Sequence, residues 1–192
     1  MTSILKVDTI QDTDGNNIIN ESGNTITIGA SGDTTNIIGT LQNDGAAVGG
    51  ANTPYFRARL SSNQNTTNGT ATKVQFDTEE FDTGNEYDNS TNYRFTPANG
   101  NTYCIIANVG MEGSSSTTVQ EARVKLYKNG SEVFENRTDP YNNSNNKINV
   151  GLQTFVTGNG SDYYEIYASI YVGSGTPRAR SYSYFSAFKL IS

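Results

Sequence analysis

Residues 94–109 constrain the fold more than any other part of this chain, because they combine a strand end, a turn and an interior strand. Pro97 has no N–H to donate to a ladder, so the strand that precedes it should end there. Asn99-Gly100 follows, and both residues tolerate the positive φ that tight turns require. From Tyr103 onward apolar residues occupy both faces of the next strand. This pattern predicts a strand in the interior of a sheet and not at its edge.

The rest of the chain also has the composition of a β protein. Ala, Leu, Glu and Lys are sparse, which gives helices little support. Short β-branched and tyrosine-rich runs alternate with turn residues, and Asn129-Gly130 suits a type I′ turn between two alternating strands. We expect about eight to ten strands in residues 54–192, which predicts a two-sheet sandwich with jelly-roll topology.

Residues 1–53 differ from the remainder and form a separate segment. They contain no Phe, Tyr or Trp, and one lysine against six acidic residues gives them a net charge of −5. Their β-like pieces, such as residues 4–7 and 25–28, are too short to close a core alone. The segment is therefore either disordered or buries its Ile and Val residues against other chains. Residues 45–51 are rich in Gly and Ala, which indicates a flexible linker before residue 54.

Several chemistries are excluded by what the sequence lacks. The chain has no His, so a Ser-His-Asp or Cys-His site is impossible. Its one cysteine, Cys104, cannot form an intrachain disulfide and is expected to be a small buried residue. The net charge of −6 argues against nucleic-acid binding. No apolar run reaches roughly 18 residues, so we predict no membrane insertion.

Motifs in residues 54–192 resemble a known family. Residues 95–103 have the pattern aromatic-x-Pro-x-x-Gly-x-x-Tyr, residues 124–130 the pattern V-x-L-x-K-N-G, and residues 185–190 a closing F-S-A-F-K-L strand. Their order and spacing resemble those of C1q/TNF-like trimeric jelly-roll domains, although Ala187 stands where that family has Gly. The resemblance implies an all-β homotrimer.

The N-terminal segment resembles a different group of proteins. Residues 4–11 (ILKVDTIQ) and 39–50 (GTLQNDGAAVGG) are similar to attachment and shaft regions of bacteriophage tail-fibre and virion-surface proteins, especially from marine phages. The resemblance implies a virion protein, assembled in the host cytoplasm, whose residues 1–53 dock on other virion proteins. Its jelly roll would then bind a glycan or protein on the host surface.

Two alternatives to a host-binding fibre remain open at this point. The first is a capsid-decorating head fibre, which need bind only the capsid. The second is a polysaccharide depolymerase, which would use paired carboxylates held about 5 to 10 Å apart. Glu79, Glu80 and Asp82 form the densest carboxylate cluster, and we expect a solvated loop there and no enzyme activity.

We expect the binding residues on the loops at the ends of the sandwich, because a rigid scaffold positions such loops. Among residues 61–71, 138–146 and 173–180, the residues Tyr141, Arg178 and Arg180 offer stacking and charge. The two arginines, beside Tyr182 and Tyr184, could hold an acidic sugar, or they could simply be exposed residues flanking a strand. We predict no cofactor and no metal. Of the carboxylates, Asp82, Asp88 and Asp139 would be the ones to contact a calcium ion of the kind that related C1q-like domains often bind.

A tyrosine row predicts the trimer interface. Residues 163–172 are expected to form the longest strand, whose even positions face the core. The odd positions place Tyr163, Tyr167 and Tyr171 on the opposite face, which is more aromatic surface than an exposed face usually carries. We therefore expect these three residues at the subunit interface, with Tyr167 nearest the three-fold axis. The alternative is a platform for stacking glycans.

Overall fold

The computed structural model describes residues 38–39, 41–43, 46–47, 52–114, 118–140 and 146–190. The chain divides into two compact units, residues 1–49 and residues 50–192. In the first unit, β1 (Gln42–Asn43) and β2 (Ala46–Ala47) form an antiparallel pair. Part of the expected linker is therefore paired. The β-like pieces expected before residue 38 lie outside the described residues.

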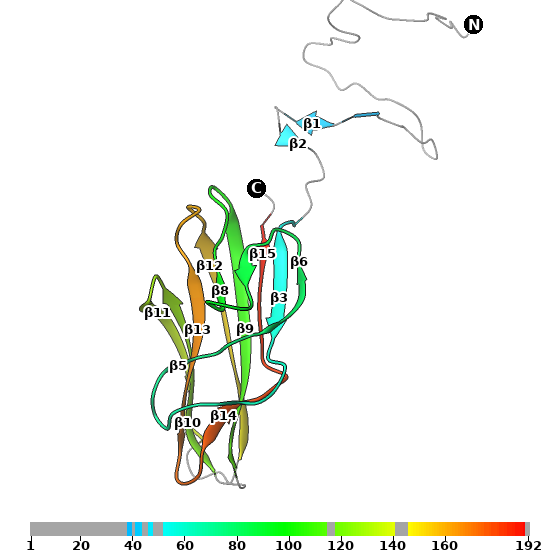
Figure 1. The fold of residues 1–192 in the computed structure, drawn as a ribbon. Coiled ribbons are helices and arrows are strands. Elements are labelled where there is room, and N and C mark those ends of the chain that lie inside the picture. Colours follow the sequence, from blue (N-terminus) through cyan, green and yellow to red (C-terminus); the bar gives the residue numbers. More distant parts are fainter. Residues whose placement is uncertain are drawn as a thin grey trace, which may run out of the picture. The chain divides into compact units, whose positions relative to one another are not determined.

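The second unit consists of two antiparallel sheets (Figure 1). The seven-stranded sheet has the order β4 (Gln64–Asn65), β14 (Pro177–Ala179), β9 (Thr102–Gly113), β15 (Tyr184–Lys189), β3 (Tyr55–Arg59) and β6 (Thr78–Asp82), with β12 (Lys147–Thr157) also paired to β9. The six-stranded sheet has the order β11 (Ser131–Thr138), β10 (Val119–Lys128), β13 (Tyr164–Val172), β8 (Arg94–Phe95) and β7 (Tyr87–Asp88), with β5 (Thr72–Lys73) also paired to β13. This is the predicted all-β jelly-roll sandwich.

The turn between β8 and β9 carries the chain from one sheet to the other. Strand β8 ends at Phe95, two residues before Pro97, and Gly100 adopts a φ of +78° in the turn. Strand β9 then pairs with β12 on one side and with β15 on the other. The prediction of an interior strand beginning near Tyr103 is confirmed.

A hydrogen-bonded clamp holds this turn in place. The Tyr103 hydroxyl donates to Oε1 of Glu86 at 2.6 Å, and the Ala98 N–H donates to the same oxygen at 2.9 Å. The Thr96 N–H donates to the Glu86 carbonyl, and the rings of Phe95 and Tyr103 meet edge to face at 5.2 Å. Burial and the hydrogen bond to Glu86 raise the pKa of Tyr103 to about 12. The hydroxyl therefore stays protonated near neutral pH and remains a donor.

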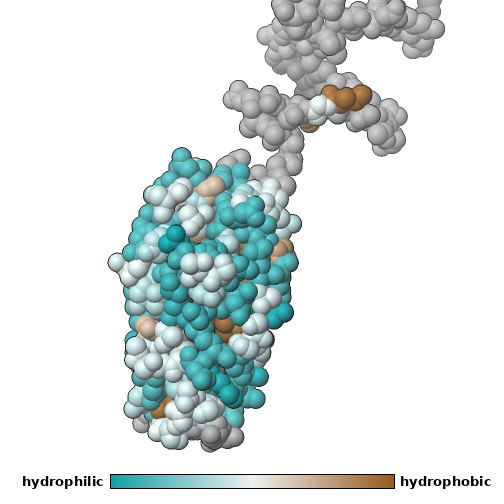
Figure 2. All heavy atoms as spheres, in the orientation of Figure 1, coloured by the Kyte–Doolittle hydropathy of each residue, from teal (hydrophilic) through white to brown (hydrophobic). Residues whose placement is uncertain are grey.

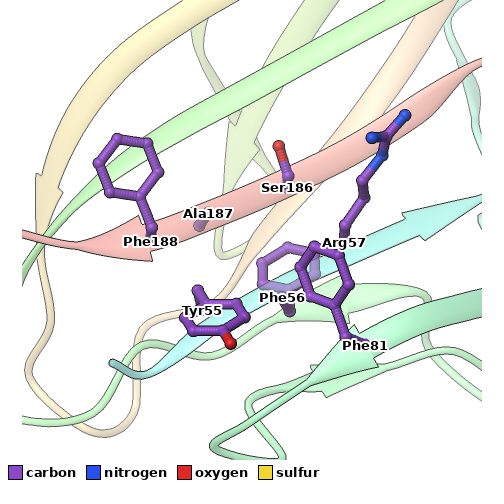
Figure 3. A pocket seen from close by; sticks show the side chains of 7 residues that line it. All are labelled: Tyr55, Phe56, Arg57, Phe81, Ser186, Ala187 and Phe188. Carbon is purple, nitrogen blue, oxygen red and sulfur yellow. The ribbon is translucent and has the colours of Figure 1, made fainter. Parts of the chain in front are cut away.

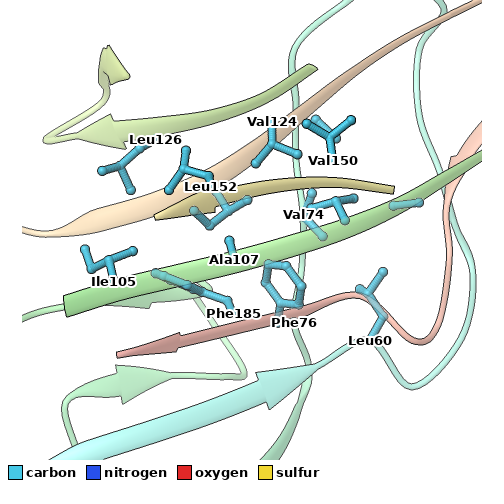
Figure 4. Close-up of a cluster of buried hydrophobic side chains, with 14 of the residues drawn as sticks. Leu60, Val74, Phe76, Ile105, Ala107, Val124, Leu126, Val150, Leu152 and Phe185 are labelled. Atoms are coloured by element: carbon cyan, nitrogen blue, oxygen red, sulfur yellow. The ribbon is translucent and has the colours of Figure 1, made fainter. Parts of the chain in front are cut away.

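The core lies between the sheets and is built from alternate residues of their strands (Figure 4). Phe185 of β15 is fully buried, and the rings of Phe56, Tyr87, Phe76 and Phe95 surround it at centroid distances of 5.1 to 6.5 Å. The even positions of residues 164–172 are all buried, as predicted: Tyr164, Ile166, Ala168, Ile170 and Val172.

Two expectations about strand length were wrong. Strand β13, with 9 residues, is shorter than β9 with 12, β12 with 11 and β10 with 10. The reason is that β12 pairs with β9 without interruption along its whole length, so the ladder continues past the predicted strand ends. The alternation of residues 73–77 predicts a short strand, but of these only Lys73 lies in one, at the end of Thr72–Lys73, although Val74 and Phe76 are fully buried.

Removing the central ring of the core should destabilise the domain strongly. Replacing Phe185 with Ala deletes a buried ring that contacts four other rings, and we expect a loss of about 3–5 kcal/mol in the free energy of unfolding. Urea unfolding measures this loss. Val133→Ala is the control, because that side chain is 52% exposed and its truncation should change stability little. Equal losses in the two variants would contradict this account of the core.

Candidate binding surfaces

Arg178 and Arg180 converge on one buried carboxylate. Arg178 Nε lies 2.7 Å from Oε1 of Glu112, and Arg180 Nε lies 3.2 Å from Oε2. Lys147 Nζ lies 3.9 Å from the same Oε2. Glu112 is only 5% exposed. Cross-strand register explains the grouping, because Lys147 of β12 and Arg178 of β14 both pair with Glu112 of β9. We call Glu112, Lys147, Arg178 and Arg180 the Glu112 cluster.

Tyr182 completes this site by holding Arg180. The guanidinium lies over the Tyr182 ring at 4.2 Å from its centroid, and Nη1 donates to the Tyr182 hydroxyl at 2.6 Å. The ring lies against the backbone of Gly110, where a Cβ atom would come within 2.2 Å of it. Only glycine at position 110 therefore leaves room for the ring on the surface of β9.

Hydrogen bonds fix the turn that carries these groups. The Gly110 N–H donates to the Ser183 hydroxyl at 3.0 Å, and the Arg180 N–H donates to the Gly110 carbonyl at 2.8 Å. The Ser181 N–H donates to Oδ1 of Asn63, whose amide nitrogen lies 3.4 Å from Glu112. The turn that carries Arg180 and Tyr182 is thus anchored to β9 and to residues 61–71.

The structure brings two of the three predicted loops together. Strand β4, within residues 61–71, pairs with strand β14, within residues 173–180. The Asn68 side chain also makes two hydrogen bonds to the Val172 backbone. Tyr141, the third predicted binding residue, lies outside the described residues. Sequence reasoning missed Glu112 and Lys147, although an acidic residue inside an otherwise apolar strand was a visible signal.

The predicted tyrosine row lies on the outer face of the six-stranded sheet. Tyr167 stacks on Tyr127 at 4.1 Å, and Arg94 lies over the ring of Tyr163 at 4.5 Å. Tyr171 is 49% exposed. Contacts within the chain therefore cover part of the rings of Tyr163 and Tyr167. Of the three tyrosines, Tyr171 is the one that remains exposed. The assignment of the row to the subunit interface stays a prediction.

The same face carries a network of ion pairs. Arg123 contacts Glu121 and Glu135, and Lys125 contacts Glu132 and Glu135, at distances of 2.6 to 3.3 Å. The Glu135 carboxyl has a lowered pKa because Lys125 and Arg123 hydrogen-bond to it, with burial opposing the effect. A mixed-charge network of this kind is typical of a solvated surface.

The outer face of the seven-stranded sheet is different, because aromatic side chains follow one cross-strand line. Phe155 and Phe188 both pair with Cys104, and Phe188 also pairs with Tyr55. The Tyr55 and Phe81 rings meet edge to face at 5.4 Å. Phe188, Tyr55 and Phe81 line a shallow hollow of about 260 Å³ (Figure 3). We call Phe155, Phe188, Tyr55 and Phe81 the aromatic row.

The remaining surfaces have fewer features of a binding site. A second hollow of about 430 Å³ lies beside the edge strands β11 and β12, next to the exposed residues Val133 and Phe134. The visible side of the sandwich in Figure 2 is mostly hydrophilic, with isolated hydrophobic spots. No group of three metal-ligating side chains occurs among the described residues. Likewise, no helix in the described part of the chain has the length and apolar character needed to cross a bilayer.

The carboxylates considered for catalysis or calcium serve the local structure. Glu80 pairs with Arg57 and Arg59. Asp82 accepts hydrogen bonds from backbone N–H groups in its own turn, including that of Gly84. Asp88 does the same and its pKa is lowered, because hydrogen bonds from residues 90–92 outweigh the effect of burial. Glu80, Asp82 and Asp88 thus all have partners within the domain.

The fold of residues 50–192 is an all-β jelly roll similar to those of C1q and TNF-family domains, as the motif in residues 95–103 predicted. Among solved structures, the globular domain of zebrafish complement 1qA protein matches with a TM-score of 0.50 at 14% identity, covering 72% of this chain and 97% of that one. Murine APRIL matches with a TM-score of 0.51 at 9% identity, covering 71% and 98%. No protein-family model and no curated protein match the sequence.

Adding a methyl group at Gly110 should displace Tyr182. Because the new Cβ would overlap the ring, we expect Gly110→Ala to cost about 1 kcal/mol in the free energy of unfolding, at the low end for overpacking. Gly151→Ala on the neighbouring strand is the control, since its Cβ would meet only ordinary contacts at 3.7 Å or more. Chemical denaturation compares the two variants. Equal stability would show that the Tyr182 ring is not held against β9.

Proposed function

We propose that this chain is a homotrimeric virion fibre protein of a bacteriophage, whose jelly roll binds a host-surface glycan or protein. The observation that carries the proposal is the C1q/TNF jelly-roll fold of residues 50–192, joined to a segment that resembles phage attachment regions. The fold is often that of a trimeric binding domain. Binding and not catalysis is the proposed activity, because the densest carboxylates are engaged in ion pairs and turns.

The position of the Glu112 cluster supports a binding role at one end of the sandwich. Strand β3 begins at Tyr55, where the chain enters the domain, and Tyr55 lies at the Cys104 end of the seven-stranded sheet. Glu112 lies eight residues further along β9, a separation of roughly 27 Å at the usual rise of a strand. The cluster is therefore at the end of the domain opposite to the chain entry, where an attachment protein would contact its target.

For the homotrimer, the aromatic row is the subunit contact that the surface chemistry favours. Three of its rings, Phe155, Phe81 and Tyr55, are 62%, 44% and 38% exposed in the single chain. Subunit interfaces are enriched in aromatic residues and depleted in charge at their centres. Arg57 and Arg59 pair with Glu80 beside the aromatic row, but the face with Tyr167 carries the larger ion-pair network. The tyrosine row is the alternative contact, and one experiment separates the two.

The two faces respond differently to an introduced charge. We expect Phe188→Asp to place three like charges in a poorly hydrated contact and to dissociate the trimer. Tyr167→Asp, a matched change at another half-buried aromatic residue, should leave the trimer intact. Light scattering checks this, since a trimer has three times the chain mass of 20.8 kDa. Dissociation by Tyr167→Asp alone would place the contact on the tyrosine row, and a monomeric unmodified chain would refute the trimer.

Deleting residues 1–45 tests the virion assignment. We expect the truncated protein to fold, because its core lies within residues 50–192, but to be absent from purified particles. Immunoblotting of particles from hosts that produce the full-length or the truncated chain gives the result. Incorporation of the truncated protein would contradict the assignment of residues 1–53 as the docking segment.

Antibody labelling of intact particles then separates the finer alternatives. Label at the tail, together with adsorption blocked by the purified chain, supports a host-binding fibre. Label confined to the capsid surface identifies a head fibre. Release of reducing ends from host polysaccharide by the purified chain would instead support a depolymerase and overturn the proposed binding role.

A further inference from the structure

We infer that the Glu112 cluster is an anion-binding site whose ligand is a carboxylate-bearing sugar. This inference deepens the proposed function, because it names the ligand class of the binding end of the domain. It stands on the charge balance of the cluster, on the fixed positions of its cations, and on their exposure.

The Glu112 cluster has an excess of positive charge. Lys147, Arg178 and Arg180 share the single carboxylate of Glu112, which is the only acidic partner of all three within the described part of the chain. The cluster therefore carries a local charge of about +2 in a chain whose net charge is −6. On the six-stranded sheet, by contrast, Arg123 and Lys125 lie among three glutamates. An added anion would offset the excess positive charge of the Glu112 cluster.

The two arginines are held in place before any ligand arrives. Glu112 is buried and orients both guanidinium groups through their Nε atoms, which leaves the Nη atoms of Arg178 without a partner among the described residues. Arg180 is fixed by its stack on Tyr182. Preorganised guanidinium groups suit planar oxyanions, because their paired N–H groups match the two oxygens of a carboxylate.

The same groups remain accessible to a ligand. The side chains of Lys147, Arg178 and Arg180 are 54%, 35% and 25% exposed, although Glu112 beneath them is buried. Nearby Asn63 and Tyr182 add an amide and a hydroxyl of the kind that hydrogen-bond sugar hydroxyls. The site thus combines a charged subsite with neutral polar groups beside it, as an acidic sugar requires.

Calorimetric titration of the full chain tests the ligand class. The probe is the trisaccharide of galacturonic acid, with the neutral galactose trisaccharide and sodium sulfate as comparisons. We expect binding of the acidic trisaccharide, weakening as NaCl is raised, with no measurable binding of the neutral one. Equal binding of both sugars, or binding of sulfate alone, would overturn the inference.

A substitution inside the cluster and one outside it should differ in their effect on binding. Lys147→Gln removes an attractive charge and should weaken binding of the acidic trisaccharide several-fold. Lys128→Gln is the control, because Lys128 is a partly exposed lysine paired with Asp162 away from the cluster. Equal affinities of the two variants would refute the site.

The result is separable from that of the proposed function. Binding of the acidic trisaccharide by a chain that is monomeric or absent from particles would sustain the ligand class and remove the virion role. A virion trimer that binds no acidic sugar would do the reverse.

Discussion

The structure depends on one crossing, where the chain passes from the six-stranded to the seven-stranded sheet between Phe95 and Tyr103. Glu86 accepts hydrogen bonds from the turn and from the Tyr103 hydroxyl, so it ties both sides of the crossing to one carboxylate oxygen. Because Phe95 and Tyr103 also pack against each other, the crossing sets how the sheets face one another. The buried aromatic cluster around Phe185 follows from that arrangement.

In both sheets alternate residues point outward, but the outward side chains of the two sheets differ in chemical character. On the six-stranded sheet, outward positions carry mixed charges that pair across β10 and β11. On the seven-stranded sheet, the outward side of β9 changes along its length, from Cys104 among aromatic rings to Glu112 among cations. A single strand thereby links a surface suited to self-association with one suited to an anion.

The sequence predicted the elements better than their partners. Proline, turn dipeptides and alternation act locally, so the strand end before Pro97, the Asn129-Gly130 hairpin and the buried even positions of β13 were all predictable. Of the Glu112 cluster, the sequence predicted the two arginines but not Glu112 or Lys147, because the pairing of β9 with β12 and β14 joins residues far apart in the chain. The aromatic row depends on register in the same way. Alternation predicts the face of a residue but not the neighbours it meets there.

Strand β12 has a consequence for handling the protein. Among the strands that the structure describes it pairs only with β9, so its other side is a sheet edge, where the Asn136 side chain donates to the Gly151 carbonyl. After Lys147 the strand contains no charged residue, and exposed Phe155 lies near its end. Long uncharged edges are templates for pairing with further strands, and natural proteins usually protect them with lysine, proline or a bulge. At high protein concentration, aggregation should therefore begin at β12. A lysine introduced on that edge is the substitution best suited to prevent it.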